Sequence, residues 1–174
     1  TQPELNPHIM SNRIAQLIER GTAFRRASMW SLNTIMNSGA LGVEVVISYK
    51  PQLIERSSEL VISELAQFDN FTDPFYRVYV LDPLVIDDLL ERRIDELSGG
   101  ELQRYAIAKT LLMDAHVYLL DEPTAGMNPN ETQVMTQFIR QLRDDRGLTI
   151  LLIEHDMQVV MGISDKVTVL DYGQ

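Results

Sequence analysis

Apolar and polar residues follow two different periods along the 174-residue chain. Apolar residues at helical spacing predict helices over about 7–20, 23–37, 59–68, 83–92, 100–113, 129–145 and 156–162. Short β-branched or leucine-rich runs predict strands near 43–48, 116–120, 149–153 and 166–170. The alternation of strands with helices predicts an α/β fold, a three-layer-like parallel sheet of about four strands with flanking helices. The stretch 53–96, mostly helical, is expected to form a small α-helical subdomain.

Composition narrows the function classes. The net charge is −10, but residues 1–50 carry +2 and the other 124 carry −12. An acidic body argues against broad nucleic-acid binding. The chain has no cysteine, which excludes disulfides and thiolate metal sites, and its three histidines match no compact zinc pattern. No apolar run reaches the length of a membrane span.

Two stretches carry the chemistry. Ser98, Gly99 and Gly100 precede an apolar-striped helix, whose start presents backbone N–H groups and a positive dipole end to an anion. The strand near 117–120 ends in Asp121 and Glu122. A carboxylate pair at a strand end suits one Mg²⁺ contact and one general base for water, although capping or solvation is the more ordinary role of such a pair.

Residues 97–104 (Leu-Ser-Gly-Gly-Glu-Leu-Gln-Arg) and 117–123 (Val-Tyr-Leu-Leu-Asp-Glu-Pro) resemble the signature motif and the Walker B strand of ABC-type ATPases. The resemblance implies that the signature serves ATP held by the opposite subunit. It also implies that Asp121 is the metal residue and Glu122 the catalytic carboxylate. The implied nucleotide-binding residues of the signature are Ser98, Gly99, Gly100 and Gln103.

The flanking motifs resemble two branches of that family. Tyr-Lys-Pro-Gln at 49–52 resembles the Q-loop of the ribosome-recycling ATPases (the RNase L inhibitor family), a likeness that extends over about 49–126. Residues 126–131 resemble the D-loop of branched-chain amino acid importer ATPases, a likeness over about 123–174 that includes an H-loop at 154–157. The resemblances imply that Gln52 reaches Mg²⁺ and the attacking water, and that His155 contacts the γ-phosphate.

The N-terminal segment resembles another protein. Pro-Glu-Leu-Asn-Pro at 3–7, Phe-Arg-Arg-Ala at 24–27 and the run at 39–43 are similar to the C-terminal part of the KH-domain-bearing small-subunit ribosomal protein. That family uses this region in ribosomal RNA contact, which makes Arg25 and Arg26 candidate RNA contacts or, alternatively, two solvated arginines. Residues 1–48 are therefore assigned as a helix–helix–strand segment that completes one integrated domain with an ABC-like part, 49–174.

The phosphate-binding loop (P-loop) of an ABC ATPase is missing from these residues. The motif Gly-x-x-x-x-Gly-Lys-Ser/Thr needs a lysine after glycine, and Lys50, Lys109 and Lys166 each follow another residue. The P-loop strand and helix are thus expected to be absent. The sheet would then run in simple sequence order, with 166–170 beside 149–153 and the two N-terminal helices covering the second face.

These patterns lead to the interpretation of an engineered or computationally assembled chimera, joined near 48–49 and 123–127, with no catalytic activity. On this interpretation the site residues are vestigial, and neither ATP nor Mg²⁺ is expected as a cofactor. No partner is required, self-association stays open, and neither RNA nor a membrane is expected. No compartment is indicated beyond the cytoplasm if the chain is made in a cell. The alternatives are a residual ATP/Mg-binding module that needs a P-loop partner, and an RNA- or ribosome-associated protein.

Overall fold

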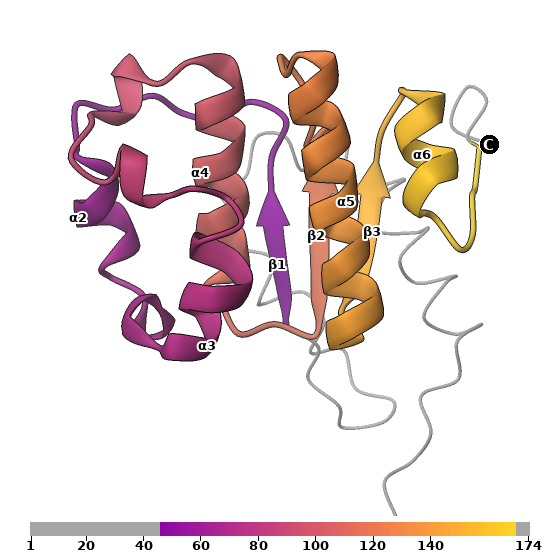
Figure 1. Cartoon of the computed structure of the whole chain (residues 1–174), viewed down its shortest axis with the longest axis horizontal. Helices are drawn as coiled ribbons and strands as arrows, with labels where there is room; N and C mark the ends of the chain where they lie inside the picture. Colours follow the sequence, from indigo (N-terminus) through magenta and orange to yellow (C-terminus); the bar gives the residue numbers. More distant parts are fainter. Residues whose placement is uncertain (1–45, 170–174) are drawn as a thin grey trace, which may run out of the picture. The chain divides into compact units, whose positions relative to one another are not determined.

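Three parallel strands form the sheet of this protein, in a computed structural model that describes residues 46–169. They are β1 (Ile47–Lys50), β2 (Val117–Asp121) and β3 (Thr149–Ile153), in the order β1-β2-β3 (Figure 1). The register pairs Lys50 with Leu120 and Asp121 with Ile153, so the three strands end close to one another. The predicted α/β class with a parallel sheet is confirmed, as is the sequence order of these three strands.

Helices connect the strands and follow the last one. They are α4 (Gly99–Leu111) between β1 and β2, α5 (Pro129–Arg146) between β2 and β3, and α6 (Met157–Ile163) after β3 (Figure 1). Right-handed crossovers between strands in sequence order put α4 and α5 on the same face of the sheet. Tyr118 and Leu120 point to that face and join the buried core there with residues of both helices, among them Ile107, Leu111, Phe138 and Leu142.

The stretch between β1 and α4 is less helical than predicted. Its elements are α2 (Val61–Leu65), α3 (Pro74–Tyr76), a turn of π-helix at Arg77–Leu81, and 3₁₀ turns at Asp69–Thr72, Asp87–Leu89 and Ile94–Glu96. The predicted helix over 83–92 is wrong. Asp73 caps a helix that begins at Pro74, because its carboxylate accepts from the Phe75 N–H. Val85, with φ of 51°, then lies outside the helical region of backbone space.

Two other predictions concern the ends of the chain. The strand expected at 166–170 is absent over residues 166–169, where Val167 and Val169 are exposed. β-branched residues favour a strand only when a neighbouring strand provides a ladder. The helices expected at 7–20 and 23–37, Arg25, Arg26 and residue 170 lie outside the described residues. Within 46–169, no helix is long and apolar enough to cross a membrane.

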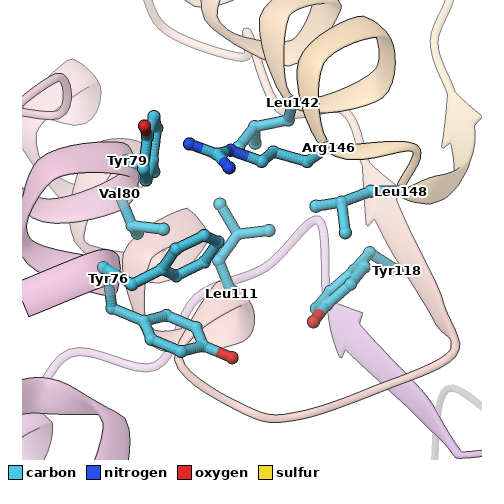
Figure 2. A pocket seen from close by; sticks show the side chains of 9 residues that line it. Tyr76, Tyr79, Val80, Leu111, Tyr118, Leu142, Arg146 and Leu148 are labelled. Atoms are coloured by element: carbon cyan, nitrogen blue, oxygen red, sulfur yellow. The ribbon is translucent and has the colours of Figure 1, made fainter. Parts of the chain in front are cut away.

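We call residues 74–81, which are α3 and the π-helical turn after it, the α3 segment. A small cavity separates this segment from the ends of α4 and α5, and Arg146 extends across the cavity (Figure 2). The guanidinium carbon of Arg146 lies 3.1 Å from the centre of the Tyr79 ring and 4.7 Å from that of Phe75. Leu111, Tyr118 and other apolar side chains line the rest. The cation–π contacts therefore tie the last turn of α5 to the α3 segment.

The end of α5 allows a prediction for stability. Gly147 ends the helix in the left-handed region, with φ of 62°, and an added Cβ would meet nothing within 4 Å. Gly147→Ala should therefore lower the free energy of unfolding by about 1 kcal/mol through backbone strain alone. Urea unfolding monitored by circular dichroism measures this change.

The matched control is Gly162→Ala in α6. Its added Cβ would make an ordinary contact of 3.4 Å with Thr136 Cγ2, and alanine favours a helix by up to about 1 kcal/mol. This variant should be as stable as the wild type or more stable. A Gly147→Ala protein that matches the wild type would contradict the left-handed conformation at this residue.

Candidate functional site

The carboxyl ends of the three strands bring four polar side chains together. Asp121 ends β2, and its Oδ2 accepts a hydrogen bond of 3.1 Å from the Tyr49 hydroxyl on β1. Lys50, the last residue of β1, donates from Nζ to the backbone oxygens of Asp121 (2.7 Å) and Glu122 (3.1 Å). His155 follows β3 by two residues. The edge of a parallel sheet is where such groups converge and where α/β proteins place ligands.

Glu122 has an unusual backbone for its residue type. Its φ is 48°, in the left-handed region that only a few per cent of non-glycine residues adopt. Its N–H donates to the Ile153 oxygen at 2.8 Å, which anchors it to the end of β3. Its Oε1 lies 3.6 Å from Nδ1 of His155, whose ring is 80% exposed. A half-buried carboxylate at the edge of solvent is placed to take a proton from a water molecule.

Glu154 fixes the turn that carries His155. Its side chain is only 1% exposed. Its carboxylate accepts hydrogen bonds from the Thr124 hydroxyl and from the N–H groups of His155 (3.0 Å) and Asp156 (3.3 Å). No sequence pattern indicates the contact between Glu154 and Thr124, because the two residues lie 30 positions apart.

Lys50 is a charged side chain with no exposed surface. Burial lowers its pKa to about 8, against the opposing pull of Asp121, Glu122 and Glu154. The amine is therefore still largely protonated at pH 7. From the sequence, Lys50 is a member of the Q-loop-like run at 49–52 and a lysine outside any P-loop, and neither pattern assigns a role to its side chain. A lysine at the last position of a buried strand is the signal that could have identified it.

The predicted signature residues form a second group at the start of α4. Ser98 caps this helix, and its hydroxyl accepts from the Glu101 N–H at 3.4 Å. Glu101 in turn accepts from the Ser98 N–H at 2.8 Å and pairs with Arg92 at 2.6 Å. This reciprocal capping box already uses two of the N–H groups at the helix start, so only part of the first turn remains for an anion.

Gly99 and Gly100 allow the signature to pack closely against the start of α5. A Cβ on Gly99 would lie 3.2 Å from the Gly126 oxygen, and one on Gly100 would lie 3.0 Å from the Glu131 carboxylate. Asn128 caps α5, since its Oδ1 accepts hydrogen bonds from the N–H groups of Asn130 and Glu131.

Gln103 and Gln52 differ in their surroundings. Gln103 is 5% exposed, and within the described part of the chain its Oε1 has no hydrogen-bond partner. Gln52 is exposed two residues beyond β1, and in residues 46–169 no hydrogen bond links it to the strand-end residues. The structure therefore groups Asp121, Glu122 and His155, and leaves Gln52 outside that group.

The donor atoms limit which metal could bind. Among the described residues, no three histidine or carboxylate side chains gather as a metal site. Asp121 offers one carboxylate at the strand end. Mg²⁺ commonly takes one or two protein carboxylates and completes its shell with phosphate oxygens and water. The donors thus fit Mg²⁺ that arrives with a nucleotide better than a metal held by protein ligands alone.

Comparison with known proteins identifies relatives of this chain. The family model described as ABC transporter matches residues 24–125. An uncharacterised ABC transporter ATP-binding protein of Methanocaldococcus jannaschii is 36% identical over 124 residues, which cover 71% of this chain and 21% of the relative. A high-affinity branched-chain amino acid transport ATP-binding protein of Escherichia coli is 44% identical over 82 residues, 47% of this chain and 32% of the relative.

Solved structures agree with these relatives. The RNase-L inhibitor structure superposes with a TM-score of 0.63 at 39% identity, covering 74% of this chain and 26% of that one. A structure of ribosome-bound archaeal Pelota and ABCE1 gives a TM-score of 0.65 at 36% identity, covering 84% and 25%. The chain thus spans about a quarter of these proteins, and resemblance to both predicted ABC branches is confirmed.

These findings overturn several predictions. The family model matches residues 24–125, a range that includes the expected join near 48, and nothing supports a ribosomal-protein fragment at 3–48 or an engineered chimera. The expected lack of enzymatic activity is also contradicted, because the relatives are described as ATP-binding proteins of ABC and branched-chain amino acid transport. So is the expectation that no partner is required, since the relatives include a transport ATP-binding protein and a ribosome-bound one. Motifs that match two branches of one family therefore do not indicate fused fragments.

The capping box at Ser98 predicts a pH dependence of stability. The pKa of Glu101 lies below its ordinary value of 4.5. The hydrogen bond from the Ser98 N–H is the largest cause, and the Ser98 side chain and the charge of Arg92 lower the pKa further. The charge therefore stabilises the fold above pH 4.5, and this contribution is lost as pH falls through the lowered pKa. Glu101→Gln keeps a capping acceptor but removes the charge. Its unfolding free energy should be lower than that of the wild type by up to about 1 kcal/mol at pH 7.

Urea unfolding at pH 7 and at pH 3 tests this prediction, with Glu91→Gln as a control at an exposed glutamate. The difference between wild type and Glu101→Gln should shrink toward zero at the lower pH, and the control should track the wild type. A difference that stays constant with pH would show that the charge of Glu101 does not contribute.

Proposed function

Because the chain belongs to the ABC transporter family, we propose that it binds and hydrolyses ATP as part of an ATP-binding cassette. The observation that carries the proposal is the convergence of Asp121, Glu122 and His155 at the carboxyl edge of one parallel sheet. A metal contact, a general base and a polar group for the terminal phosphate are the groups that hydrolysis of a phosphoanhydride needs.

Each of these residues has a distinct role in the proposal. Asp121 contributes a carboxylate oxygen to the Mg²⁺ that accompanies ATP, with the Tyr49 hydroxyl holding that carboxylate in place. Glu122 orients the attacking water and accepts its proton. His155, exposed and 3.6 Å from Glu122, contacts the γ-phosphate. Gln52, at the exposed start of the segment after β1, reaches the metal and the water once nucleotide is bound.

The start of α4 is proposed to bind a second nucleotide. Ser98, Gly99 and Gly100 turn the positive end of the helix dipole and the remaining N–H groups toward phosphate oxygens. Gln103 is buried and supports this turn from inside. As in the cassettes that the motif resembles, the ATP at this helix would be held mainly by a second cassette, so the chain works in a pair.

The phosphate cradle has to come from protein outside these 174 residues, because they contain no Gly-x-x-x-x-Gly-Lys-Ser/Thr. That loop supplies most of the positioning of the β- and γ-phosphates. The described residues provide the general base for the attacking water and the polar contacts of the strand ends to the terminal phosphate.

Two substitutions test the proposal in the protein that carries this chain. Glu122→Gln should lower kcat for ATP by at least about 100-fold, the contribution of a general base, with KM nearly unchanged. Asp121→Asn should weaken the binding of Mg²⁺, which shows as a higher metal concentration at half-maximal activity. Phosphate release at varied ATP and Mg²⁺ measures both.

Glu91→Gln is the matched control, because it makes the same chemical change at an exposed surface position. It should leave kcat and the Mg²⁺ dependence as in the wild type. A Glu122→Gln protein that hydrolyses ATP as fast as the control would rule out the proposed role of the strand-end carboxylates.

A further inference from the structure

Glu122 adopts a conformation that costs energy. A non-glycine residue in the left-handed region is disfavoured and persists only where its surroundings impose it. On one side the N–H of Glu122 is held by the Ile153 oxygen at 2.8 Å. On the other side its own oxygen accepts from Ala125 N–H at 3.2 Å and from Lys50 Nζ at 3.1 Å.

Lys50 is the group that joins these restraints to the sheet. Its Nζ also donates to the Asp121 oxygen at 2.7 Å. One ammonium group therefore bonds the backbone oxygens of two consecutive residues, Asp121 and Glu122. Asp121, Glu122 and Glu154 are the charged groups that act on it, and all three are acidic. A buried ammonium persists where hydrogen bonds and opposite charge compensate for lost water.

The burial of Lys50 also argues against direct contact with a substrate. Its side chain has no exposed surface, whereas His155 is 80% exposed. A nucleotide that reaches His155 and Glu122 would still be separated from Lys50 by the backbone of residues 121–122. Its action on the reaction must therefore pass through that backbone.

We propose that Lys50 is a positioning residue, which clamps the Asp121–Glu122 backbone and thereby directs the Glu122 carboxylate toward the attacking water. Its effect on hydrolysis rests on the proposed function, but the clamp itself does not. Without the ammonium group, Glu122 keeps its bonds to Ile153 and Ala125 and loses the contact that ties it to β1.

The first experiment measures the clamp without any nucleotide. In Lys50→Met, which keeps an unbranched apolar stem, hydrogen exchange at the Glu122 amide should become about 10-fold faster by NMR, because the turn opens locally. Amides in the middle of β2 should keep their protection. Lys166→Met is the control, since it removes the same charge from an exposed position and should not change exchange at Glu122. Unchanged exchange at Glu122 in Lys50→Met would overturn the proposal.

A variant that loses protection throughout β2 would have lost its fold in general, and Lys50→Arg then decides. Arginine keeps the charge and the donors but is longer, so protection of β2 should return while exchange at Glu122 stays fast. If Lys50→Arg protects both β2 and the Glu122 amide from exchange as well as the wild type does, the charge alone matters and not the placement of the amine. That result would overturn the clamp.

The second experiment measures catalysis. Lys50→Met should lower kcat about 10- to 100-fold with KM changed less than about twofold, because the base is misplaced while the nucleotide contacts remain. In a Glu122→Gln background the same substitution should cause no further loss, since both act through one carboxylate. An additive loss would show that Lys50 acts elsewhere. A wild type without hydrolysis would instead reject the proposed function, and the exchange experiment would still decide on the clamp.

Discussion

The bridge from Lys50 to the backbone oxygens of Asp121 and Glu122 is the contact on which the site depends. β1 and β2 are far apart in sequence, and only the parallel register brings Lys50 beside the end of β2. Burying an ammonium group is costly, and this cost is offset only where hydrogen-bond acceptors and opposite charges are placed well. The same arrangement leaves Glu122 half-buried and beside His155, where a carboxylate can act on water.

The start of α4 lies close to the backbone just before α5. Gly99 and Gly100 carry no Cβ, and the start of α4 lies against the Gly126 oxygen and the Glu131 carboxylate as a result. Both helices that begin here, α4 and α5, have a capping box at their N-terminus. Two well-satisfied helix starts in contact make a rigid unit, in which donors that are not used internally keep a fixed direction.

Local sequence rules anticipated the regular parts of this fold and failed where distant contacts decide. The helix predicted over 129–145 agrees with α5 (Pro129–Arg146), because its bounds are set locally by the cap at Asn128 and the left-handed stop at Gly147. The Pro83 helix was wrong, since Asp73 and Pro74 formed the better start upstream. The strand expected at 166–170 depended on a neighbour that no local pattern can guarantee.

The candidate site follows the same division. Motif spacing identified Asp121, Glu122 and His155, which the strand register then brought together. Lys50, Tyr49, Thr124 and Glu154 could not be assigned from sequence, because each matters through a partner at least 30 positions away. Likeness to two branches of one family does not distinguish a fusion of proteins from a single family member, and the chimera interpretation is wrong for this reason.

The most direct test of this account uses Mn²⁺ as a paramagnetic stand-in for Mg²⁺ together with ATP. Relaxation enhancement in NMR detects weak binding and reports which amides lie near the metal. The amides of Asp121, Glu122 and His155 should broaden in wild type, and Asp121→Asn should abolish the effect. Broadening that is absent, or that is confined to other surfaces and unaffected by Asp121→Asn, would contradict a nucleotide–metal site at the strand ends.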